Sequence, residues 1–353
     1  MSCHRILHIV FSSRIAGSER YCIDLANRQA AAGHEVHVAG LRSSPLRAAL
    51  SVKVRFHPIG WFLRGMFLRR LVARLAPDVC HGHLSAACKA LKGVPAHQNT
   101  VATLHVGYKA HQHAWLSGLI CVNRAQAGRL SGYRGMARTI PNWLPQVSAT
   151  AASTPGIRQE LGIGADVFLV GAVGRLHPSK GMDVLISAFR ASAPVRAALV
   201  ILGEGPHRSK LERLCAGDAR IHLVGYRSAV HDSLKDLDLF VSPSREESFG
   251  LAIIEAMSIG APIIATAAEG PGEFLQDQPV TLVPPGSVEA LATEISRAHK
   301  QYLAGGLPKI GYDLSFCDPA ARVANVMDFY SQVIDAGHWN RARQENRNVA
   351  LAT

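Results

Sequence analysis

Residues 242–251 carry the strongest chemical signal in the sequence, because they combine charged groups, hydroxyls and glycine between two apolar runs. The first run predicts a strand that ends at Ser242, and the second predicts a helix over 249–258. The start of such a helix presents free N–H groups and the positive end of its dipole, which attract anions. We therefore expect this segment to bind a phosphate group.

Two glutamates are spaced around this helix start. Glu247 comes before the apolar run and Glu255 lies inside it, so roughly 12 Å would separate them along a continuous helix. That spacing predicts that one carboxylate meets a sugar and the other a ribose, with a diphosphate between them. The preference of acidic residues for a helix N-terminus also accounts for Glu247. It does not account for Glu255, because a charge in an apolar run needs a partner.

A second signal lies in residues 171–181, where Arg175 and Lys180 follow a predicted strand and precede a predicted helix. This position places them at the carboxyl edge of a parallel sheet, where ligands bind in such folds. They would supply positive charge to a diphosphate, arginine as a fork and lysine as a point charge. The alternative is a pair of solvated loop cations. The P-loop pattern is absent from this segment.

The first half of the chain gives weaker signals. Gly17 follows the first predicted strand and would let the backbone approach a phosphate or a sugar. His105 ends another predicted strand, although a single histidine there is more often a packing residue. His81 and His83 end the strand before it, and we expect their side chains to diverge and not to share a metal.

The elements that must position these residues form an alternating pattern, which is typical of a parallel sheet covered by helices. In the first half we predict strands at 5–11, 35–39, 52–57, 79–83, 101–105 and 119–122, with helices at 18–32 and 63–76. In the second half we predict strands at 168–174, 198–203, 222–225, 239–242, 263–266 and 280–283. Helices are predicted there at 181–192, 207–216, 229–236, 249–258 and 287–301.

This pattern predicts an α/β chain of two doubly wound, Rossmann-like domains. An aperiodic Ala/Ser/Thr/Pro stretch at 147–156 reads as the linker between them. We expect an N-terminal domain over 1–145 and a C-terminal domain over 146–318. A last amphipathic helix over 319–337 and a disordered tail over 338–353 complete the predicted organisation.

The charge of the chain is uneven. Of its 353 residues, those at 1–145 include 19 Lys+Arg and 4 Asp+Glu, whereas those at 146–353 include 19 and 22. The excess in the first half predicts an anionic partner, which is a nucleic acid, an acidic membrane surface or an acidic substrate.

The sequence also indicates where the protein acts. It contains no run of 18 apolar residues, the length that would indicate a membrane span. Scattered cysteines without a C-x-x-C pair, and an N-terminal apolar run too short for a signal peptide, favour a cytoplasmic protein with reduced thiols.

Together these residues resemble the retaining nucleotide-sugar glycosyltransferases of glycosyltransferase family 4, which have the two-domain GT-B fold. The Gly-Arg-Leu motif at 174–176 with Lys-Gly at 180–181, the E-x7-E pair, and the Thr-x-His strand end at 103–105 carry the resemblance. The chain departs from the family at Ala16, Asn123 and Trp143, where Gly, Ser and Gly are usual. These departures lie toward the first domain and weaken inferences about the acceptor.

The resemblance implies a role for each matching residue. Arg175 and Lys180 would bind the diphosphate, Glu247 the donor sugar, and Glu255 the ribose. His105 would hold the donor sugar near its reacting face. Further substrate contacts are implied at Gly17, Gly203, Tyr226, Ser248, Phe249, Gly250 and Leu251.

The resemblance also implies a reaction without a metal or another cofactor. Asp236 and Asp238 look like a metal-binding D-x-D pair, but they precede a predicted strand, so we interpret them as a helix-to-strand connection. The last helix would cross back to pack on the first domain, which in this family mainly binds the acceptor.

The segment 60–75, which overlaps the helix predicted at 63–76, indicates which partner the basic first half binds. Leu68, Leu71, Val72 and Leu75 share one arc and predict a core-facing stripe. Outside that arc lie three apolar residues and three arginines: Phe62, Met66, Phe67, Arg69, Arg70 and Arg74. This composition suits an anionic membrane interface, and a solvated basic face is the alternative. A nucleic-acid partner is disfavoured, because no known binding module accompanies the charge.

These inferences predict a cytoplasmic retaining glycosyltransferase, peripheral at the inner face of the membrane. It would move a sugar from a nucleotide diphosphate donor, such as a UDP-sugar, to a lipid-linked or polysaccharide acceptor such as lipopolysaccharide core. Two alternatives remain. One is a nucleotide-sugar epimerase or hydrolase on the same fold, which needs no acceptor. The other is a non-catalytic partner subunit that binds nucleotide sugar.

Overall fold

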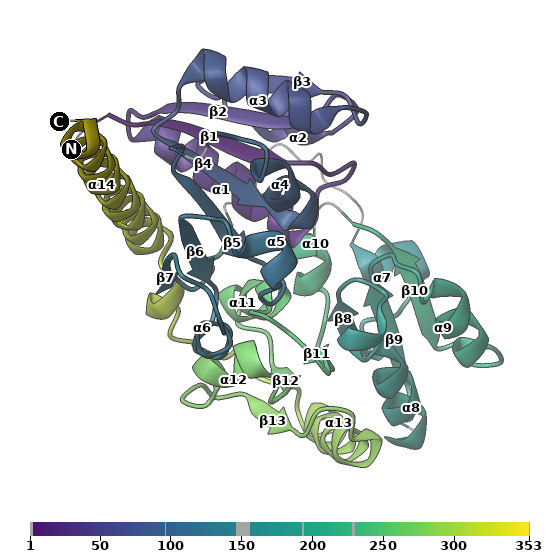
Figure 1. Cartoon of the computed structure of the whole chain (residues 1–353). Helices are drawn as coiled ribbons and strands as arrows, with labels where there is room; N and C mark the ends of the chain where they lie inside the picture. Colours follow the sequence, from purple (N-terminus) through teal and green to yellow (C-terminus); the bar gives the residue numbers. More distant parts are fainter. Residues whose placement is uncertain (1–2, 96, 146–155, 193, 228–229, 353) are drawn as a thin grey trace. The chain divides into compact units, whose positions relative to one another are not determined.

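The structure is a computed structural model that describes residues 3–95, 97–145, 156–192, 194–227 and 230–352, with only the backbone helix described over 338–352. The chain divides into two compact units, Met1–Pro145 with Cys317–Thr353, and Gln146–Phe316. All of the linker predicted at 147–156 except Gly156 lies outside the described residues. The units are described separately below (Figure 1).

The first unit is built on a seven-stranded sheet with the order β3-β2-β1-β4-β5-β6-β7. Each neighbouring pair is parallel. The strands are β1 Arg5–Val10, β2 Glu35–Leu41, β3 Arg55–Ile59, β4 Val79–His83, β5 Thr100–Leu104, β6 Gly118–Cys121 and β7 Met136–Thr139. The helices are α1 Gly17–Ala31, α2 Leu46–Ala49, α3 Arg64–Leu75, α4 Leu84–Leu91, α5 Ala110–His113, α6 Arg124–Gly128 and α14 Pro319–Ala352.

Alternation along the buried strand β1 separates the two faces of this sheet. Leu7 and Ile9 pack into a core that includes side chains of α3 and α4, whereas Val10 packs into a core with side chains of α1. Because side chains alternate along a strand, His8 points to the same face as Val10. A polar side chain is therefore buried on the α1 side of the sheet.

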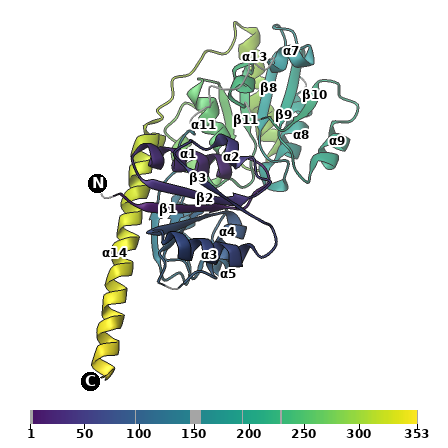
Figure 2. The ribbon, with the colours of Figure 1, turned by 90° about the horizontal axis from the view of Figure 1, so that it is seen from above.

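Helix α14 belongs to the first unit and buries Val326, Phe329, Tyr330 and Val333. It is one continuous helix in both views (Figures 1 and 2). The predicted helix ends at 337 and is followed by a predicted disordered tail, whereas the backbone is helical to Ala352. Residues 338–352 contain no glycine or proline that would end a helix.

The second unit is built on a six-stranded parallel sheet with the order β10-β9-β8-β11-β12-β13. The strands are β8 Phe168–Val173, β9 Ala197–Leu202, β10 Ile221–Gly225, β11 Leu239–Ser242, β12 Ile263–Thr266 and β13 Thr281–Val283. The helices are α7 Ile157–Leu161, α8 Met182–Ser192, α9 Arg208–Cys215, α10 Val230–Lys235, α11 Leu251–Ser258, α12 Glu269–Leu275 and α13 Val288–Leu303. One core cluster joins this sheet to helices α8, α9 and α13.

The predicted fold class is confirmed, because both units are α/β and doubly wound. In each sheet the strand order reverses beside the first strand of the unit, next to β1 and next to β8. In open α/β sheets, ligands bind outside the carboxyl ends of the strands at such a reversal. We therefore expect the predicted site residues to lie at the carboxyl edges of the two sheets, beside β1 and β8.

Candidate functional site

In the second unit, the loop after β8 and the loop after β11 lie against each other at the carboxyl edge of the sheet. The backbone N–H groups of Arg245 and Glu246 both donate to the carbonyl oxygen of Ser179, at 2.8 and 3.0 Å. Gly181 packs so closely that a Cβ on it would lie 2.0 Å from the carbonyl oxygen of Pro243. The two strongest sequence motifs therefore form one structure.

An ion pair also joins these loops, since Lys180 Nζ donates to Glu247 Oε2. Both side chains are partly buried. A lysine ammonium has three N–H donors, so Lys180 can hold Glu247 and an anion together. The structure thus brings together two residues that the sequence placed in separate motifs.

Two arginines in these loops have different surroundings. Arg245 makes a bidentate contact with Asp183, at 2.8 and 2.9 Å, and donates to the carbonyl oxygen of Pro178. The hydrogen bond from Arg245 holds the pKa of Asp183 below its usual range. Arg175 is exposed, and its guanidinium has no partner among the described residues. Arg175 is therefore available to an anion, and Arg245 clamps the loop.

Helix α11 begins at Leu251 and not at 249 as predicted, because Gly250 before it has a φ of 94°. Glycine adopts this left-handed conformation at no steric cost. Glu247 therefore lies in the loop, so the separation of roughly 12 Å expected along a continuous helix does not describe the two glutamates. Glu255 is partly buried on α11.

The residues between the glutamates are held by α12. The ring of buried Phe249 lies 5.2 Å from that of Phe274. A Cβ on Gly270 would lie 2.1 Å from the carbonyl oxygen of Ser248. The N–H of Gly270 donates to the carbonyl oxygen of Glu247 at 3.1 Å. No helix is predicted between the strands at 263–266 and 280–283, yet Pro271 is accommodated in the first turn of α12, where it loses no helical hydrogen bond.

Glycines let neighbouring strand ends pack closely beside Arg175. Gly203 has a φ of 148°, and a Cβ on it would lie 1.9 Å from the carbonyl oxygen of Gly174. Its N–H donates to the carbonyl oxygen of Gly225 at 2.8 Å. Tyr226 follows this glycine and is exposed. Packing explains Gly203, and the substrate contacts of Gly203 and Tyr226 stay predictions.

Asp236 and Asp238 lie between α10 and β11, as predicted. Asp238 Oδ2 accepts from Arg158 at 2.6 Å and from the N–H of Leu169 at 2.7 Å. Asp238 therefore links Arg158 to the start of β8.

In the first unit, Gly17 comes at the end of the loop that follows β1, and His105 comes directly after β5. Gly17 is the first residue of α1, where Glu19 Oε2 accepts from the N–H of Ala16 at 3.0 Å. His105 follows β5 directly and is partly buried, with the ring of Tyr21 edge-on at 5.1 Å. Burial lowers the pKa of His105 to about 4. Its imidazole is therefore neutral near pH 7.

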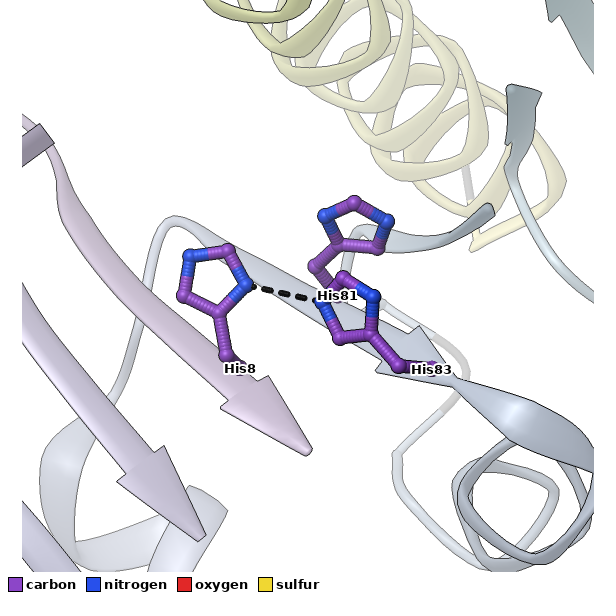
Figure 3. A group of neighbouring side chains, drawn as sticks. All are labelled: His8, His81 and His83. Carbon is purple, nitrogen blue, oxygen red and sulfur yellow. Dashed lines mark hydrogen bonds between the residues drawn. The ribbon is translucent and has the colours of Figure 1, made fainter. Parts of the chain in front are cut away.

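The expectation that His81 and His83 diverge is wrong. Residues two apart on a strand share a face, and their ring centroids are 4.2 Å apart. His8 of β1 joins them, and Figure 3 shows its ring directed at His83. Among the described residues, these three histidines are the His/Cys/Asp/Glu group close enough to share a metal ion. Sequence reasoning missed His8, whose signal is a polar residue inside the apolar run 6–11.

The comparisons with known proteins match both units. The model described as Glycosyltransferase Family 4 matches residues 15–161, and the model described as Glycosyl transferases group 1 matches residues 167–301. The lipopolysaccharide core biosynthesis glycosyltransferase LpsD of Rhizobium meliloti is 25% identical over 309 residues, 83% of this chain and 87% of LpsD. The lipopolysaccharide core biosynthesis mannosyltransferase LpsB of the same organism is 34% identical over 159 residues, 40% of this chain and 44% of LpsB.

A solved structure extends the likeness to the whole fold. Anabaena Alr3699/HepE, in complex with UDP-glucose, matches with a TM-score of 0.69 at 20% identity, covering 98% of this chain and 100% of that one. Strands β2 to β7 of the first sheet, the whole second sheet and the loops bearing Arg175, Lys180 and Glu247 fall within the two matched regions. The chain therefore belongs to glycosyltransferase family 4 and has its GT-B fold.

Proposed function

We propose that the protein is a retaining, metal-independent glycosyltransferase that moves a sugar from a UDP-sugar to a lipid-linked or polysaccharide acceptor such as lipopolysaccharide core. The observation that carries this proposal is the Lys180–Glu247 ion pair just before the start of α11, in two adjoining loops, one of which also bears the exposed Arg175. Two likenesses support it: LpsD acts in lipopolysaccharide core biosynthesis, and HepE was solved with UDP-glucose.

The diphosphate is the group that this edge suits best. As the bond between the sugar and the β-phosphate breaks, negative charge develops on the leaving diphosphate. Arg175 as a fork, Lys180 as a point charge and the N–H groups at the start of α11 stabilise that charge. These groups take the place that a divalent cation has in other transferases.

The carboxylates provide recognition of the two sugars. Glu247, held by Lys180, accepts hydrogen bonds from donor-sugar hydroxyls, and Glu255 accepts them from the ribose. Retention follows from attack on the face that the leaving group vacates, with the leaving phosphate taking the proton of the acceptor hydroxyl. The chain then needs no nucleophile of its own.

The acceptor side of the proposal rests on α3 and the turn before it. Five large hydrophobic side chains are exposed there, including Trp61 at 57% and Phe62 at 84%. Arg69, Arg70 and Arg74 are exposed beside them, while Leu68, Leu71 and Val72 face the core as predicted. An apolar patch edged by arginines is suited to an anionic membrane surface.

No helix among the described residues has both the length and the apolar character that crossing a bilayer requires. We place the enzyme at the cytoplasmic face of the membrane as a peripheral protein.

A donor screen tests the proposal. The melting temperature of the full chain is measured with UDP-, GDP- and ADP-sugars in the presence of EDTA, and we expect UDP-sugars to raise it, because ligand binding stabilises the folded state. The Arg175→Ala variant is the control and should lose the shift. Epimerisation of a UDP-sugar without an acceptor would instead support the epimerase alternative. Stabilisation without any turnover, in the presence of lipopolysaccharide core acceptors, would support a non-catalytic subunit.

A further inference from the structure

A chain of hydrogen bonds runs through the first unit and ends at His105. His8 Nε2 lies 2.7 Å from Gln29 Oε1, and His8 Nδ1 lies 3.1 Å from His83 Nε2. His83 Nδ1 lies 3.4 Å from His105 Nε2. Gln29, His8 and His83 are fully buried, whereas His105 is partly exposed at the carboxyl edge of β5. A buried polar chain thus reaches the edge where ligands bind in this fold.

Which atom donates in each hydrogen bond of this chain follows from its first residue, Gln29. Gln29 Nε2 donates to the sulfur of Met327 at 3.3 Å, so the amide oxygen faces His8. The opposite amide orientation would set that oxygen against the lone pairs of the sulfur. His8 must therefore donate from Nε2 to Gln29.

Each following proton is then determined. Burial lowers the pKa of His8 to about 4 and that of His83 well below its usual value, so both rings are neutral and carry one proton each. His8 Nδ1 has a lone pair, and His83 Nε2–H must donate to it. His83 Nδ1 then accepts from His105 Nε2–H. The remaining nitrogen of His105, Nδ1, makes no hydrogen bond within the described part of the chain.

We infer that Gln29, His8 and His83 are positioning residues that hold His105 protonated on Nε2, so that Nδ1 accepts a hydrogen bond from a hydroxyl of the sugar substrate. The inference rests on the proposed function for its substrate. Tyr21, edge-on to the His105 ring, fixes the plane of that ring. Because an imidazole presents a donor or an acceptor according to its tautomer, the buried chain decides which hydrogen bond the substrate can make.

A metal ion is a weaker explanation of the same cluster. All six ring nitrogens of His8, His81 and His83 already have partners, since His81 contacts Tyr330 and Thr103. A metal would have to displace these hydrogen bonds to reach a lone pair. Stoichiometric zinc, found by elemental analysis of the purified full chain, would overturn the inference.

Histidine-labelled protein tests the tautomer directly. Long-range ¹H–¹⁵N spectra of the full chain near pH 7 distinguish protonated from bare ring nitrogens, and the His105→Gln variant assigns the signal. We expect His105 to carry its proton on Nε2. A proton on Nδ1, or a charged ring, would overturn the inference.

Two substitutions of His83 separate positioning from packing. His83→Asn keeps an acceptor oxygen near the place of Nδ1, whereas His83→Leu removes it. We expect His105 to remain an Nε2–H tautomer in His83→Asn and to show both tautomers in His83→Leu. The matched control is His37→Leu, which removes a buried imidazole on β2 that contacts His57 and Glu35. The control should leave the His105 spectrum unchanged.

Kinetics with a UDP-sugar identified by the donor screen complete the test. His83→Leu should lower kcat on the order of 10- to 100-fold with little change in the donor KM, because the lost alignment acts in the transition state. His83→Asn should recover most of this loss. If wild-type protein turns over no donor, the proposed function fails, and the spectra still decide the tautomer. Equal kcat in His83→Leu and wild type would overturn the positioning role.

Discussion

Arg175 and Arg245 are the same residue type in adjacent loops, and their partners separate their functions. Arg245 is held by Asp183, whereas Arg175 is exposed with no partner in the described part of the chain. We predict that Arg175→Ala lowers kcat/KM by about 10²- to 10³-fold, the usual cost of losing one charge-stabilising donor. Its melting temperature should match wild type. Initial rates with the identified UDP-sugar check this.

Arg245→Ala is the matched control for that prediction. It breaks a partly exposed ion pair, which contributes no more than about 1 kcal/mol, so it should lower the melting temperature slightly and reduce kcat/KM less than Arg175→Ala. If Arg245→Ala were the more damaging to kcat/KM, the assignment of the two arginines would have to be reversed.

The buried histidines predict a stability that depends on pH. The pKa of His8 is about 4 in the folded chain, below its ordinary value of 6.5, so the unfolded chain binds more protons between these values. The stabilisation is present above pH 6.5 and is lost as the pH falls toward 4. From pH 7 to pH 5 His8 alone accounts for about 2 kcal/mol of the free energy of unfolding. Urea unfolding at both values measures this loss.

The His8→Gln variant isolates this contribution, because glutamine does not titrate. The variant should be less stable at pH 7 and should lose about 2 kcal/mol less than wild type between the two pH values. An identical pH dependence in both proteins would mean that His8 is not buried as a neutral ring.

The local hydrophobic pattern determined which helices and strands could be predicted from the sequence. Strands β4, β11 and β12 have their predicted bounds; β11 and β12 are short, largely apolar runs with sharp ends, whereas β4 ends in His-Gly-His. β7 was missed because Met136–Thr139 is a partly exposed edge strand with few apolar residues. α12 was missed because its glycines and proline suggest a loop, while its contact with the 247–248 backbone depends on the tertiary fold.

The candidate site likewise combines features that the sequence shows with contacts that only the fold creates. The residue types and loop positions of Arg175, Lys180 and Glu247 are visible in the sequence, because motif spacing is local. The Lys180–Glu247 ion pair and the His8–His83 contact join residues far apart in the chain. These contacts depend on strand order, which periodicity does not specify.

Trp143, which departs from the family pattern, fills a buried position in the first unit. Its Nε1 donates to Asp24 Oδ2 at 2.5 Å, and its ring centroid lies 4.5 Å from that of Tyr21. We predict that Trp143→Ala lowers the free energy of unfolding by about 3–5 kcal/mol, as for other buried aromatic residues. Denaturant unfolding measures this loss. The exposed Trp61 supplies the control, since Trp61→Ala should change stability little; comparable losses would contradict the prediction.

Helix α3 and its preceding turn give a prediction about membranes. The Phe62→Ser/Phe67→Ser double variant should lose binding to vesicles that contain phosphatidylglycerol, because insertion of these apolar side chains is removed. Arg69→Glu/Arg70→Glu should weaken the same binding on the order of tenfold or more, because each basic residue near an anionic surface contributes about 1 kcal/mol. Co-sedimentation measures both effects.

A control from the second unit guards against a general effect of lost hydrophobicity. Val195 is an exposed hydrophobic residue of that unit, so Val195→Ser should bind vesicles like wild type. Equal binding of wild type to pure phosphatidylcholine would count against recognition of an anionic surface.

For the whole molecule, the two units differ in charge as strongly as the two halves of the sequence. Residues 317–353 contain four arginines and four acidic residues, so assigning α14 to the first unit leaves that unit at +15 (23 − 8) and the second at −3 (15 − 18). The candidate diphosphate site lies in the second unit, which is slightly acidic. The excess positive charge therefore requires a different partner, which we take to be the acceptor or the membrane.

This separation predicts that salt acts differently on the two substrates. Long-range attraction between the basic unit and an anionic surface is screened beyond a Debye length of about 8 Å at physiological ionic strength, whereas contacts of a diphosphate with Arg175 and Lys180 are short and screened less. Raising NaCl should therefore reduce vesicle binding by tenfold or more and raise the donor Kd only a few-fold. Calorimetry with the UDP-sugar and co-sedimentation with anionic vesicles, over one salt series, measure the two slopes. Equal slopes would mean that donor and membrane compete for the same positive charge, and the acceptor-side role of the first unit would then fail.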